Sequence, residues 1–261
     1  MFASTLSRLI RMLRCSRKRR ILFLGFFPIT IFVAASPAYG AGECLNLSFR
    51  PDRSNNLPQE WKVLTFPKIT RHTAYQVVEG EAGKFWVKAE SEASASALIR
   101  EIQFDPKAYP ILRWRWKVDN VIQKGDERKK EGDDYAARVY VNFRYNPDQA
   151  TAWERLKYGF VRGIYGSYPP KAALNYIWAN RLPREKSADN VYTDRAKMIA
   201  VESGSGRIGT WVDEERNIYQ DYVSLFGEEP PEVIGIAIMT DTDDTKEKAV
   251  AYYADIALCP N

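Results

Sequence analysis

Histidine is almost absent from this sequence of 261 residues, in which His72 is the single one. One histidine excludes a metal site built on a histidine pair and leaves room for one serine–histidine arrangement at most. The neighbours of His72 suggest no catalytic partner, and we interpret it as a loop residue. Glycine-rich phosphate loops are also absent: residues 203–206 read Ser-Gly-Ser-Gly, match no nucleotide fingerprint and predict a hairpin turn.

Acidic residues are missing from the first forty positions, which contain seven basic ones. Residues 21–35 run without a charge, and small residues follow, with Ala38 and Gly40 set two apart as signal peptidase requires. This order predicts a cleavable signal peptide over residues 1–40. The apolar run is shorter than the roughly 20 residues that span a bilayer, and Pro28 interrupts it; a retained membrane anchor is the alternative.

The predicted signal peptide accounts for the basic character of the chain. The full sequence has 38 basic and 33 acidic residues, a formal charge of +5 and a pI near 9.0. Without the seven basic residues of 1–40, the chain has 31 basic and 33 acidic residues, a formal charge of −2. With this balance of charge, we do not expect a nucleic-acid partner. We expect a periplasmic or secreted protein with a single domain over residues 41–261 and no stable membrane span after cleavage.

Cysteine is scarce as well, with three residues in the chain. Cys15 belongs to the predicted signal peptide, and Cys44 and Cys259 remain at opposite ends of the mature chain. An oxidising compartment would let this pair form a disulfide, which would leave no free thiol to act as a nucleophile. Closing so long a loop would stabilise the fold by roughly 4–5 kcal/mol in the chain-entropy model. The alternative is two unrelated free thiols.

Aromatic residues, by contrast, are abundant, with seven Trp, fifteen Tyr and twelve Phe, and this enrichment favours β-strands. Residues 113–118 alternate, so that Trp114 and Trp116 lie on one face of a strand and Arg113 and Arg115 on the other. Helix signals are few. We expect an all-β fold, a β-sandwich of jelly-roll type with one or two short helices in loops. Strands are expected at 84–89, 97–104, 113–118, 135–143, 196–202, 216–223, 234–239 and 250–258, a helix at 148–158, and a helix or a strand at 171–179.

Five blocks of sequence form a series along the chain. They are Leu-Arg-Trp-Arg-Trp-Lys-Val (112–118), Gly-Asp-Asp-Tyr-Ala-Ala-Arg-Val-Tyr-Val (132–141), Tyr-Ile-Trp-Ala (176–179), Gly-Ile-Ala-Ile-Met-Thr-Asp-Thr-Asp (235–243) and Ala-Tyr-Tyr-Ala-Asp-Ile (251–256). Together they resemble the bacterial family called domain of unknown function 3047, over most of residues 45–258, and the resemblance implies no known activity. The turn into Trp61 and Asp255 near the chain end are similar to features of galactose-binding-like jelly rolls of carbohydrate-binding modules, which is an analogy of fold.

The loop at residues 241–245 reads Asp-Thr-Asp-Asp-Thr and follows an expected apolar strand. Clustered carboxylates with hydroxyls are oxygen ligands suited to a hard cation such as Ca²⁺. We therefore take Asp241 and Asp243 as candidate calcium ligands. The spacing is not that of an EF-hand loop, which needs a glycine turn and a glutamate at its twelfth position. The alternatives are a solvated acidic turn and contact with a ligand.

Acidic and basic side chains adjoin the polar face of the strand expected at 135–143. If the arginines of the strand at 113–118 shared that face, opposite charges would meet there. Such a group is either a buried arginine–carboxylate network or a groove that binds a polar ligand. The residues concerned are Asp133, Asp134, Arg138 and Tyr140, together with Arg113 and Arg115.

Aromatic, amide and charged side chains also combine elsewhere as they do in sugar-binding sites, where rings stack on C–H faces and planar polar groups bond to hydroxyls. The same residue types build ordinary cores and ion pairs, so both interpretations stay open. One set consists of Tyr176, Trp178, Asn180, Arg181, Tyr192, Asp194 and Arg195, and another of Trp211, Arg216, Asn217 and Asp221.

These observations lead to three hypotheses about function. The first is an exported, non-catalytic β-sandwich that binds a carbohydrate or another polar ligand. The second is a polysaccharide-active enzyme, either a glycoside hydrolase with two carboxyls across one cleft or a lyase. The third is a structural or assembly protein of the envelope, which predicts an exposed apolar patch. The candidate hydrolase carboxyls are Asp133 or Asp134 with Asp221 or Asp241, and the candidate lyase residues are Tyr140 and Arg138.

Overall fold

The computed structural model of the chain describes residues 42–80, 83–149 and 170–261. Contacts between residues divide the chain into two units, Met1–Ala38 and Tyr39–Asn261. All described residues belong to the second unit, which contains the fold and every candidate site discussed below.

Two expectations fall wholly or mostly on residues that the structure does not describe. The predicted signal peptide at 1–40 lies outside the described residues, as does the expected helix at 148–158 from residue 150 onward. Within the described part of the chain, no helix is long and apolar enough to cross a membrane.

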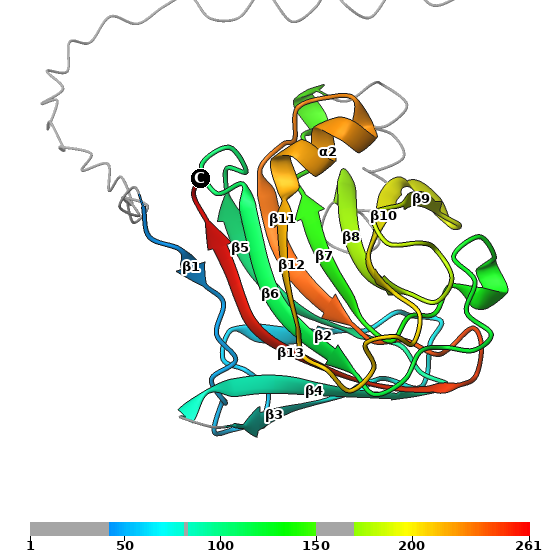
Figure 1. The fold of residues 1–261 in the computed structure, drawn as a ribbon. Coiled ribbons are helices and arrows are strands. Elements are labelled where there is room, and N and C mark those ends of the chain that lie inside the picture. The colour runs from blue at the N-terminus through cyan, green and yellow to red at the C-terminus, as the bar shows by residue number, and fades with distance from the viewer. Residues whose placement is uncertain (1–41, 81–82, 150–169) are drawn as a thin grey trace, which may run out of the picture. The chain divides into compact units, whose positions relative to one another are not determined.

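Two β-sheets packed face to face make up the described fold (Figure 1), so the expected all-β sandwich of jelly-roll type is confirmed. In spatial order the first sheet contains β11 (Val212–Asn217), β6 (Ile111–Val118), β13 (Lys248–Cys259), β4 (Phe85–Glu92) and β3 (Ala74–Glu79), and β1 (Leu45–Asn46) pairs with β13. The second sheet contains β2 (Trp61–Leu64), β5 (Ala97–Phe104), β12 (Val233–Met239), β7 (Arg138–Phe143), β8 (Ala172–Ala179), β10 (Thr193–Ser203) and β9 (Ser187–Asn190). The described helices are α2 (Ile218–Phe226) and the short 3₁₀ helices η2 (Lys130–Gly132) and η3 (Pro147–Gln149).

Large aromatic side chains fill the space between the sheets. Strand β6 of the first sheet turns Trp114 and Trp116 inward, and β8 of the second sheet turns Tyr176 and Trp178 inward, each at most 1% exposed. The rings of Trp114 and Tyr176 lie 5.3 Å apart between centroids, and those of Trp116 and Trp178 lie 5.8 Å apart. Truncating one such buried ring to alanine costs about 3–5 kcal/mol. The inward-facing residues that the alternation predicted for 113–118, Trp114 and Trp116, therefore make the contact that joins the two sheets.

Residues 216–223 do not form the single strand expected from the sequence. Strand β11 ends at Asn217, whose side chain accepts a hydrogen bond from a backbone amide at 2.9 Å and caps α2. The helix ends before Gly227, whose φ of 71° is one that glycine adopts without strain. Ile218 and Tyr222 lie one turn apart and are both buried, so a helical period describes the segment better than a period of two.

Several short strands were not expected from the sequence. Strands β2, β3 and β9 lie at the edges of their sheets, and most of their residues are partly or fully exposed. An edge strand without a fully buried face shows little hydrophobic alternation, which is the signal on which strand prediction depends. The segment 171–179, expected as a helix or a strand, is strand β8.

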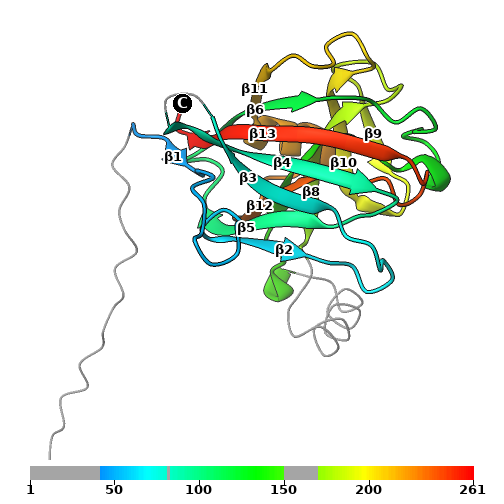
Figure 2. The same ribbon diagram turned by 90° about the horizontal axis from the view of Figure 1, so that it is seen from below.

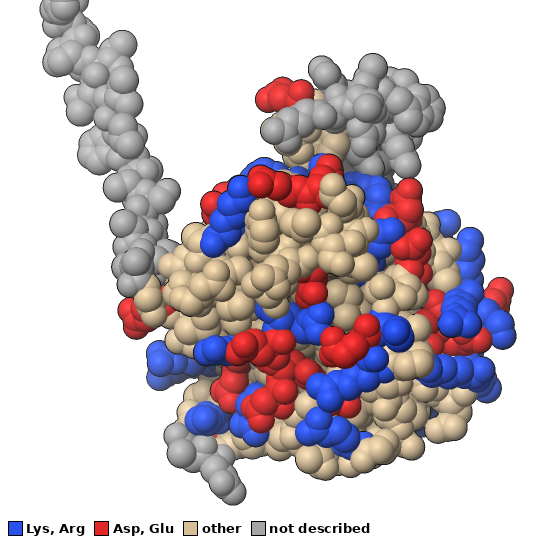
Figure 3. All heavy atoms as spheres, turned by 45° about the horizontal axis from the view of Figure 1, so that its top comes forward, with Lys and Arg blue, Asp and Glu red and all other residues tan. Residues whose placement is uncertain are grey.

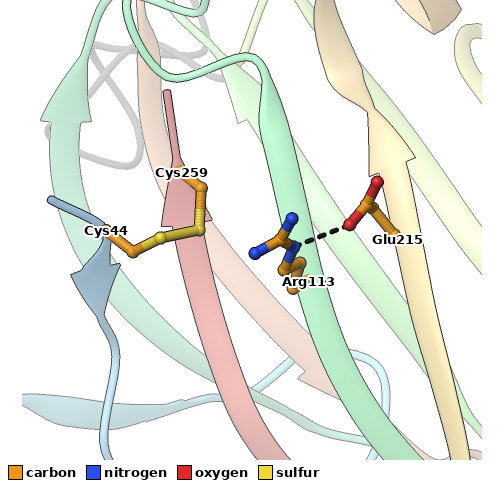
Figure 4. The surroundings of a disulfide bond; sticks show 4 residues. All are labelled: Cys44, Arg113, Glu215 and Cys259. Carbon is orange, nitrogen blue, oxygen red and sulfur yellow. Dashed lines mark hydrogen bonds and ion pairs between the residues drawn. A yellow bond between two sulfur atoms is a disulfide. The ribbon is translucent and has the colours of Figure 1, made fainter. Parts of the chain in front are cut away.

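The predicted disulfide joins Cys44 and Cys259. Cys44 precedes β1 and Cys259 ends β13, and these antiparallel strands pair Leu45 with Leu258 beside the bridge (Figure 4). Since β13 lies in the middle of the first sheet (Figure 2), the bridge ties the N-terminal strand to the centre of that sheet.

Because the bridge spans 215 residues, we predict that the double variant Cys44→Ser/Cys259→Ser has a free energy of unfolding lower by about 4–5 kcal/mol. Denaturant unfolding of the oxidised protein and of the variant measures the difference. A thiol reductant should lower the midpoint of the unaltered protein and leave that of the variant unchanged. Equal midpoints for the oxidised protein and the variant would contradict the prediction.

Candidate functional site

The outer face of the first sheet carries three half-buried aromatic rings from separate segments, which we name the aromatic cluster: Trp86 of β4, Tyr252 of β13 and Trp211, which precedes β11. The centroid of Trp211 lies 5.7 Å from that of Trp86 and 6.3 Å from that of Tyr252, with edge-on geometry in both pairs. Lys117 Nζ lies 4.1 Å from the Tyr252 centroid, and Arg115 Cζ lies 5.4 Å from that of Trp211. These cation–π contacts hold partly exposed rings in place beside charged groups.

A hollow of about 420 Å³ lies next to the aromatic cluster: Arg115 lines the hollow and also contacts the Trp211 ring. Arg115 pairs with Asp213 at 2.8 Å and with Asp255 at 3.4 Å, and Arg113 pairs with Glu215 at 2.7 Å. The disulfide also lines this hollow, close to the last of these pairs (Figure 4). Every side chain in these ion pairs is at least one-third exposed, so the charged groups remain accessible to a ligand.

Asp255 lies where β13 is irregular. The pairing of β13 with β6 shifts register between Ala254 and Ala257, and Asp255 has a φ of 50°, a region that residues other than glycine rarely enter. Asp255 also lines a second hollow of about 240 Å³, together with Asn46 and Arg50. Asp255 therefore lies between two hollows on a strained stretch of backbone, and such strain is concentrated at functional sites.

A second group, which we name the acidic cluster, lies where β12 ends and β7 begins in the second sheet. It consists of Asp134, which precedes β7, and of Asp241 and Asp243, which follow β12. One carboxylate oxygen from each of the three lies within 4.8 Å of the others. Asp134 and Asp241 are buried, and Asp243 is half-buried. The two residues predicted as calcium ligands are thus joined by a third carboxylate from a distant part of the sequence.

Arg138 is a buried cation beside the acidic cluster. Its Nη2 donates to Asp241 Oδ2 at 2.6 Å and contacts the backbone oxygen of Asp133, while its Nη1 donates to Tyr140 Oη at 2.9 Å. Backbone amides complete the network: Tyr135 N donates to Asp241 Oδ1 at 3.3 Å, and Asp244 N and Thr245 N donate to Asp134 at 3.2 and 2.6 Å. Of the two interpretations open from the sequence, this arrangement favours a buried arginine–carboxylate network.

Burial dominates the electrostatics of this network. It raises the pKa of Asp241 well above its usual range; Arg138 opposes this effect, and the neighbouring carboxylates add to it. The pKa values of Asp243 and Asp244 are also raised, first by burial and then by adjacent carboxylates. Burial raises the pKa of Tyr140 to about 12. The Tyr140 hydroxyl therefore stays protonated at neutral pH, which does not suit the base of a lyase.

Residues 59–257 match the family model described as "Protein of unknown function (DUF3047)". The chain belongs to this family. A search of curated proteins finds no match. Among solved structures, similarity is found to the family 11 carbohydrate-binding module of the cellulosomal cellulase Lic26A-Cel5E of Clostridium thermocellum, at 9% identity and a TM-score of 0.42, covering 85% of this chain and 97% of that chain. A second is the family 11 module from Clostridium thermocellum in complex with a β-1,3-1,4-mixed-linked tetrasaccharide, at 10% identity and a TM-score of 0.37, covering 85% and 98%.

The ligand-binding residues predicted for this DUF3047 chain do not share one face. Arg113 and Arg115 point outward from the first sheet, whereas Arg138 and Asp133 belong to the second sheet and its loops. The hypothesis that these groups meet on one polar face is therefore wrong. Alternation within a strand assigns side chains to two faces, but it does not say which sheet the strand joins.

The side chains of Trp178 and Asp221 belong to neither group. Trp178 is fully buried, and its Nε1 donates to a backbone oxygen at 3.0 Å, so it is a core residue rather than a surface for a ligand. Asp221 belongs to α2, where it accepts a hydrogen bond from Tyr176 Oη at 2.8 Å and pairs with Arg216 at 2.8 Å. Asp221 is thus bonded to Arg216 and Tyr176. It does not lie across a cleft from Asp133 or Asp134, as the two carboxyls of a hydrolase would.

Two of the remaining predicted positions contact the loops of the acidic cluster: Asn180 Nδ2 donates to the backbone oxygen of Asp134 at 2.8 Å, and Tyr192 Oη donates to Asp244 at 3.2 Å. Asp194 is exposed near the start of β10, and the neighbouring Arg195 donates from Nε to the backbone oxygen of Lys171 at 2.6 Å. His72 is exposed and lies 3.1 Å from the backbone oxygen of Ile69, in a loop as expected. The predicted positions thus form two groups. One contains Arg113, Arg115 and Trp211 on the outer face of the first sheet, and the other contains Asp133, Asp134, Arg138, Tyr140, Asp241 and Asp243.

Sequence reasoning missed two features. The first is the pair of aromatic residues Trp86 and Tyr252. They occupy outward positions in the strands expected at 84–89 and 250–258, so the alternation could have identified them. The other is a pair of buried glutamates, Glu202 of β10 and Glu214 of β11, for which no local pattern exists because their strands belong to different sheets.

Glu214 is the less well compensated of these two glutamates. Arg207 pairs with Glu202 at 2.8 Å, whereas Glu214 accepts a hydrogen bond from Trp116 Nε1 at 3.2 Å. Burial, and after it the charge of Glu202, raises the pKa of Glu214 from 4.5 to about 7. The hydrogen bond from Trp116 and then the charges of Arg184 and Arg207 oppose this rise.

We predict that Glu214→Gln stabilises the protein at pH 8 by on the order of 2 kcal/mol, and much less at pH 5. A carboxyl whose pKa is higher in the folded state favours folding while protonated, and this contribution is lost as the pH rises from about 4.5 to about 7. Urea unfolding at both pH values measures the effect. Glu215→Gln removes a charge from the outer face of the same strand and is the control. An equal effect of Glu214→Gln at both pH values would refute the prediction.

Proposed function

We propose that the protein is an exported, non-catalytic β-sandwich that binds a carbohydrate on the outer face of its first sheet. The observation that carries this proposal is the position of Asp255 between two hollows, the larger of which adjoins the aromatic cluster. Half-exposed aromatic rings can stack on the C–H faces of a sugar, and the carboxylate and guanidinium groups offer planar acceptors and donors to its hydroxyls. Both kinds of group are present here within one surface.

The charges favour a ligand without strong net charge. The larger hollow presents the cations Arg113 and Arg115 together with three carboxylates in direct ion pairs, so it offers no excess of positive charge to a polyanion. On the face drawn in Figure 3, basic and acidic side chains are interspersed rather than gathered into a field of one sign. A neutral glycan fits this surface better than a chain of uronic acids.

The same geometry favours binding over hydrolysis. Asp213 and Asp255 both pair with Arg115, whereas glycoside hydrolysis requires two carboxyls on either side of the scissile bond, with one acting as the acid. An assembly function in the envelope has less support. The large apolar side chains that are exposed in the described residues are Val63 and Leu64 of β2, Tyr192 and Val223, and they belong to three separate segments.

Two observations support export. The sequence begins with a basic segment followed by the uncharged residues 21–35. The disulfide requires an oxidising compartment to form and persist. Together they favour a periplasmic or secreted location, where cell-wall and exopolysaccharide chains are available as ligands.

To test the proposal, we suggest screening the protein against a glycan array and insoluble cell-wall and exopolysaccharide material, followed by calorimetry with the best ligand. Trp211→Ala should weaken binding about tenfold, because it removes a stacking ring. Asp255→Gly should weaken binding without lowering stability, because glycine adopts the φ of 50° while lacking the carboxylate. Tyr192→Ala, which removes an exposed ring outside the site, is the matched control.

Three outcomes would count against the proposal. An array and pull-down negative throughout would remove the carbohydrate ligand. Unchanged affinity in both Trp211→Ala and Asp255→Gly would place the ligand elsewhere on the molecule. Release of reducing ends or unsaturated products from a bound polysaccharide would show the enzyme of the second hypothesis instead.

A further inference from the structure

The acidic cluster brings carboxylates from two distant segments into one buried place. Asp134 lies in the loop that leads into β7, and Asp241 and Asp243 lie in the loop that leaves β12. Each contributes an oxygen that lies within 4.8 Å of the other two. Separations of this size allow three oxygens to contact a single cation, since calcium–oxygen distances are 2.3–2.6 Å.

The positive charge near the acidic cluster does not balance the negative charge of its carboxylates. Arg138 is the buried cation in contact with it, through Asp241 at 2.6 Å. Asp133 and Asp244 add two further carboxyl groups from the same two loops, and Lys246 reaches a backbone oxygen rather than a carboxylate. Like charges held close together in a desolvated site repel strongly unless a cation or a proton compensates them.

Carboxylate oxygens of two residues at this place receive no hydrogen bond from the described residues. Asp133 is 6% exposed, and its Oδ2 accepts a hydrogen bond from Asn190 Nδ2 at 3.2 Å, whereas its Oδ1 has no hydrogen-bond partner among the described residues and lies 3.7 Å from Nη2 of Arg138, the cation that also bonds Asp241. Asp243 receives no hydrogen bond from another described residue to its carboxylate, whereas Asp134 and Asp241 each have two donors. Buried polar groups are nearly always paired, so an unpaired acceptor at this point indicates a missing positive partner.

We propose that Asp134, Asp241 and Asp243 bind a calcium ion, which clamps the loop before β7 to the loop after β12. The donor set consists of oxygens only, without histidine or cysteine, and this selects a hard cation over zinc or copper. Calcium accepts irregular oxygen geometry and completes its coordination with water, while magnesium demands a near-ideal octahedron. The site is distinct from the carbohydrate surface on the first sheet and does not depend on it.

The test uses the full protein after treatment with EDTA and removal of the chelator. Calorimetric titration with CaCl₂ should show one site, with a dissociation constant at or below the range of about 10⁻⁴–10⁻³ M found in extracellular modules. The thermal unfolding midpoint should rise with CaCl₂, rise less with MgCl₂ and fall again with EDTA.

Asp243→Asn is the informative variant, because it removes a ligand that is half-buried and makes no ion pair with another described residue, so the fold should persist. Its calcium affinity should fall about tenfold or more, since fewer charged ligands remain. Asp244→Asn is the matched control: its carboxylate accepts a hydrogen bond from Tyr192 Oη at 3.2 Å and lies outside the three-residue cluster. Calcium binding should survive in this control.

A measurement on the unaltered protein keeps the proposal testable even if a variant fails to fold. Tb³⁺, which replaces calcium, should show luminescence sensitised by Tyr135, whose backbone amide contacts Asp241, and CaCl₂ should quench it by displacement. Absence of calorimetric heat, of luminescence and of any change in midpoint would overturn the proposal. A midpoint raised by acidification but not by CaCl₂ would show that protons compensate the acidic cluster instead, and equal calcium affinity in Asp243→Asn would place the cation elsewhere.

Discussion

Two tryptophans on strand β6 impose the constraint on which the rest of the structure depends. Because successive residues of a strand point to opposite faces, burying Trp114 and Trp116 forces Arg113 and Arg115 outward. The buried rings meet two aromatic rings of β8 at centroid distances of 5.3 and 5.8 Å, so the two sheets are joined through a continuous aromatic core. Charged groups are consequently displaced to the outer faces, to the edge between the sheets and to the loops at strand ends.

Charged side chains are exposed on the outer face of the first sheet and buried in the loops of the second sheet. On the first sheet, arginines and carboxylates form exposed pairs, each of which contributes roughly 0–1 kcal/mol to stability and can exchange a partner for a ligand at little cost. At the acidic cluster the charges are buried with Arg138, and removing one partner of such a pair is expensive. The first arrangement suits reversible recognition, and the second suits a fixed structural role.

Strand β13 connects these features to the covalent structure. It lies at the centre of the first sheet, carries the register shift around Asp255 and ends at Cys259, where the disulfide holds β1 against it. The irregularity thus lies in a strand paired on both sides and anchored at its end. This surrounding structure can hold Asp255 in a backbone conformation that an isolated strand would avoid.

The sequence by itself determined the class of the fold and the faces of individual strands, because the pleat imposes a period of two wherever one face is buried. It predicted the disulfide as one of two alternatives, and the pairing of β1 with β13 decided between them. It also indicated Asp241 and Asp243 as neighbours, since they are close in the chain. Only the tertiary structure decided that Arg113 and Arg138 belong to different sheets, that Asp134 joins Asp241, and that Glu202 approaches Glu214. The physical reason is that side-chain alternation is local, whereas strand pairing depends on contacts between segments far apart in the chain.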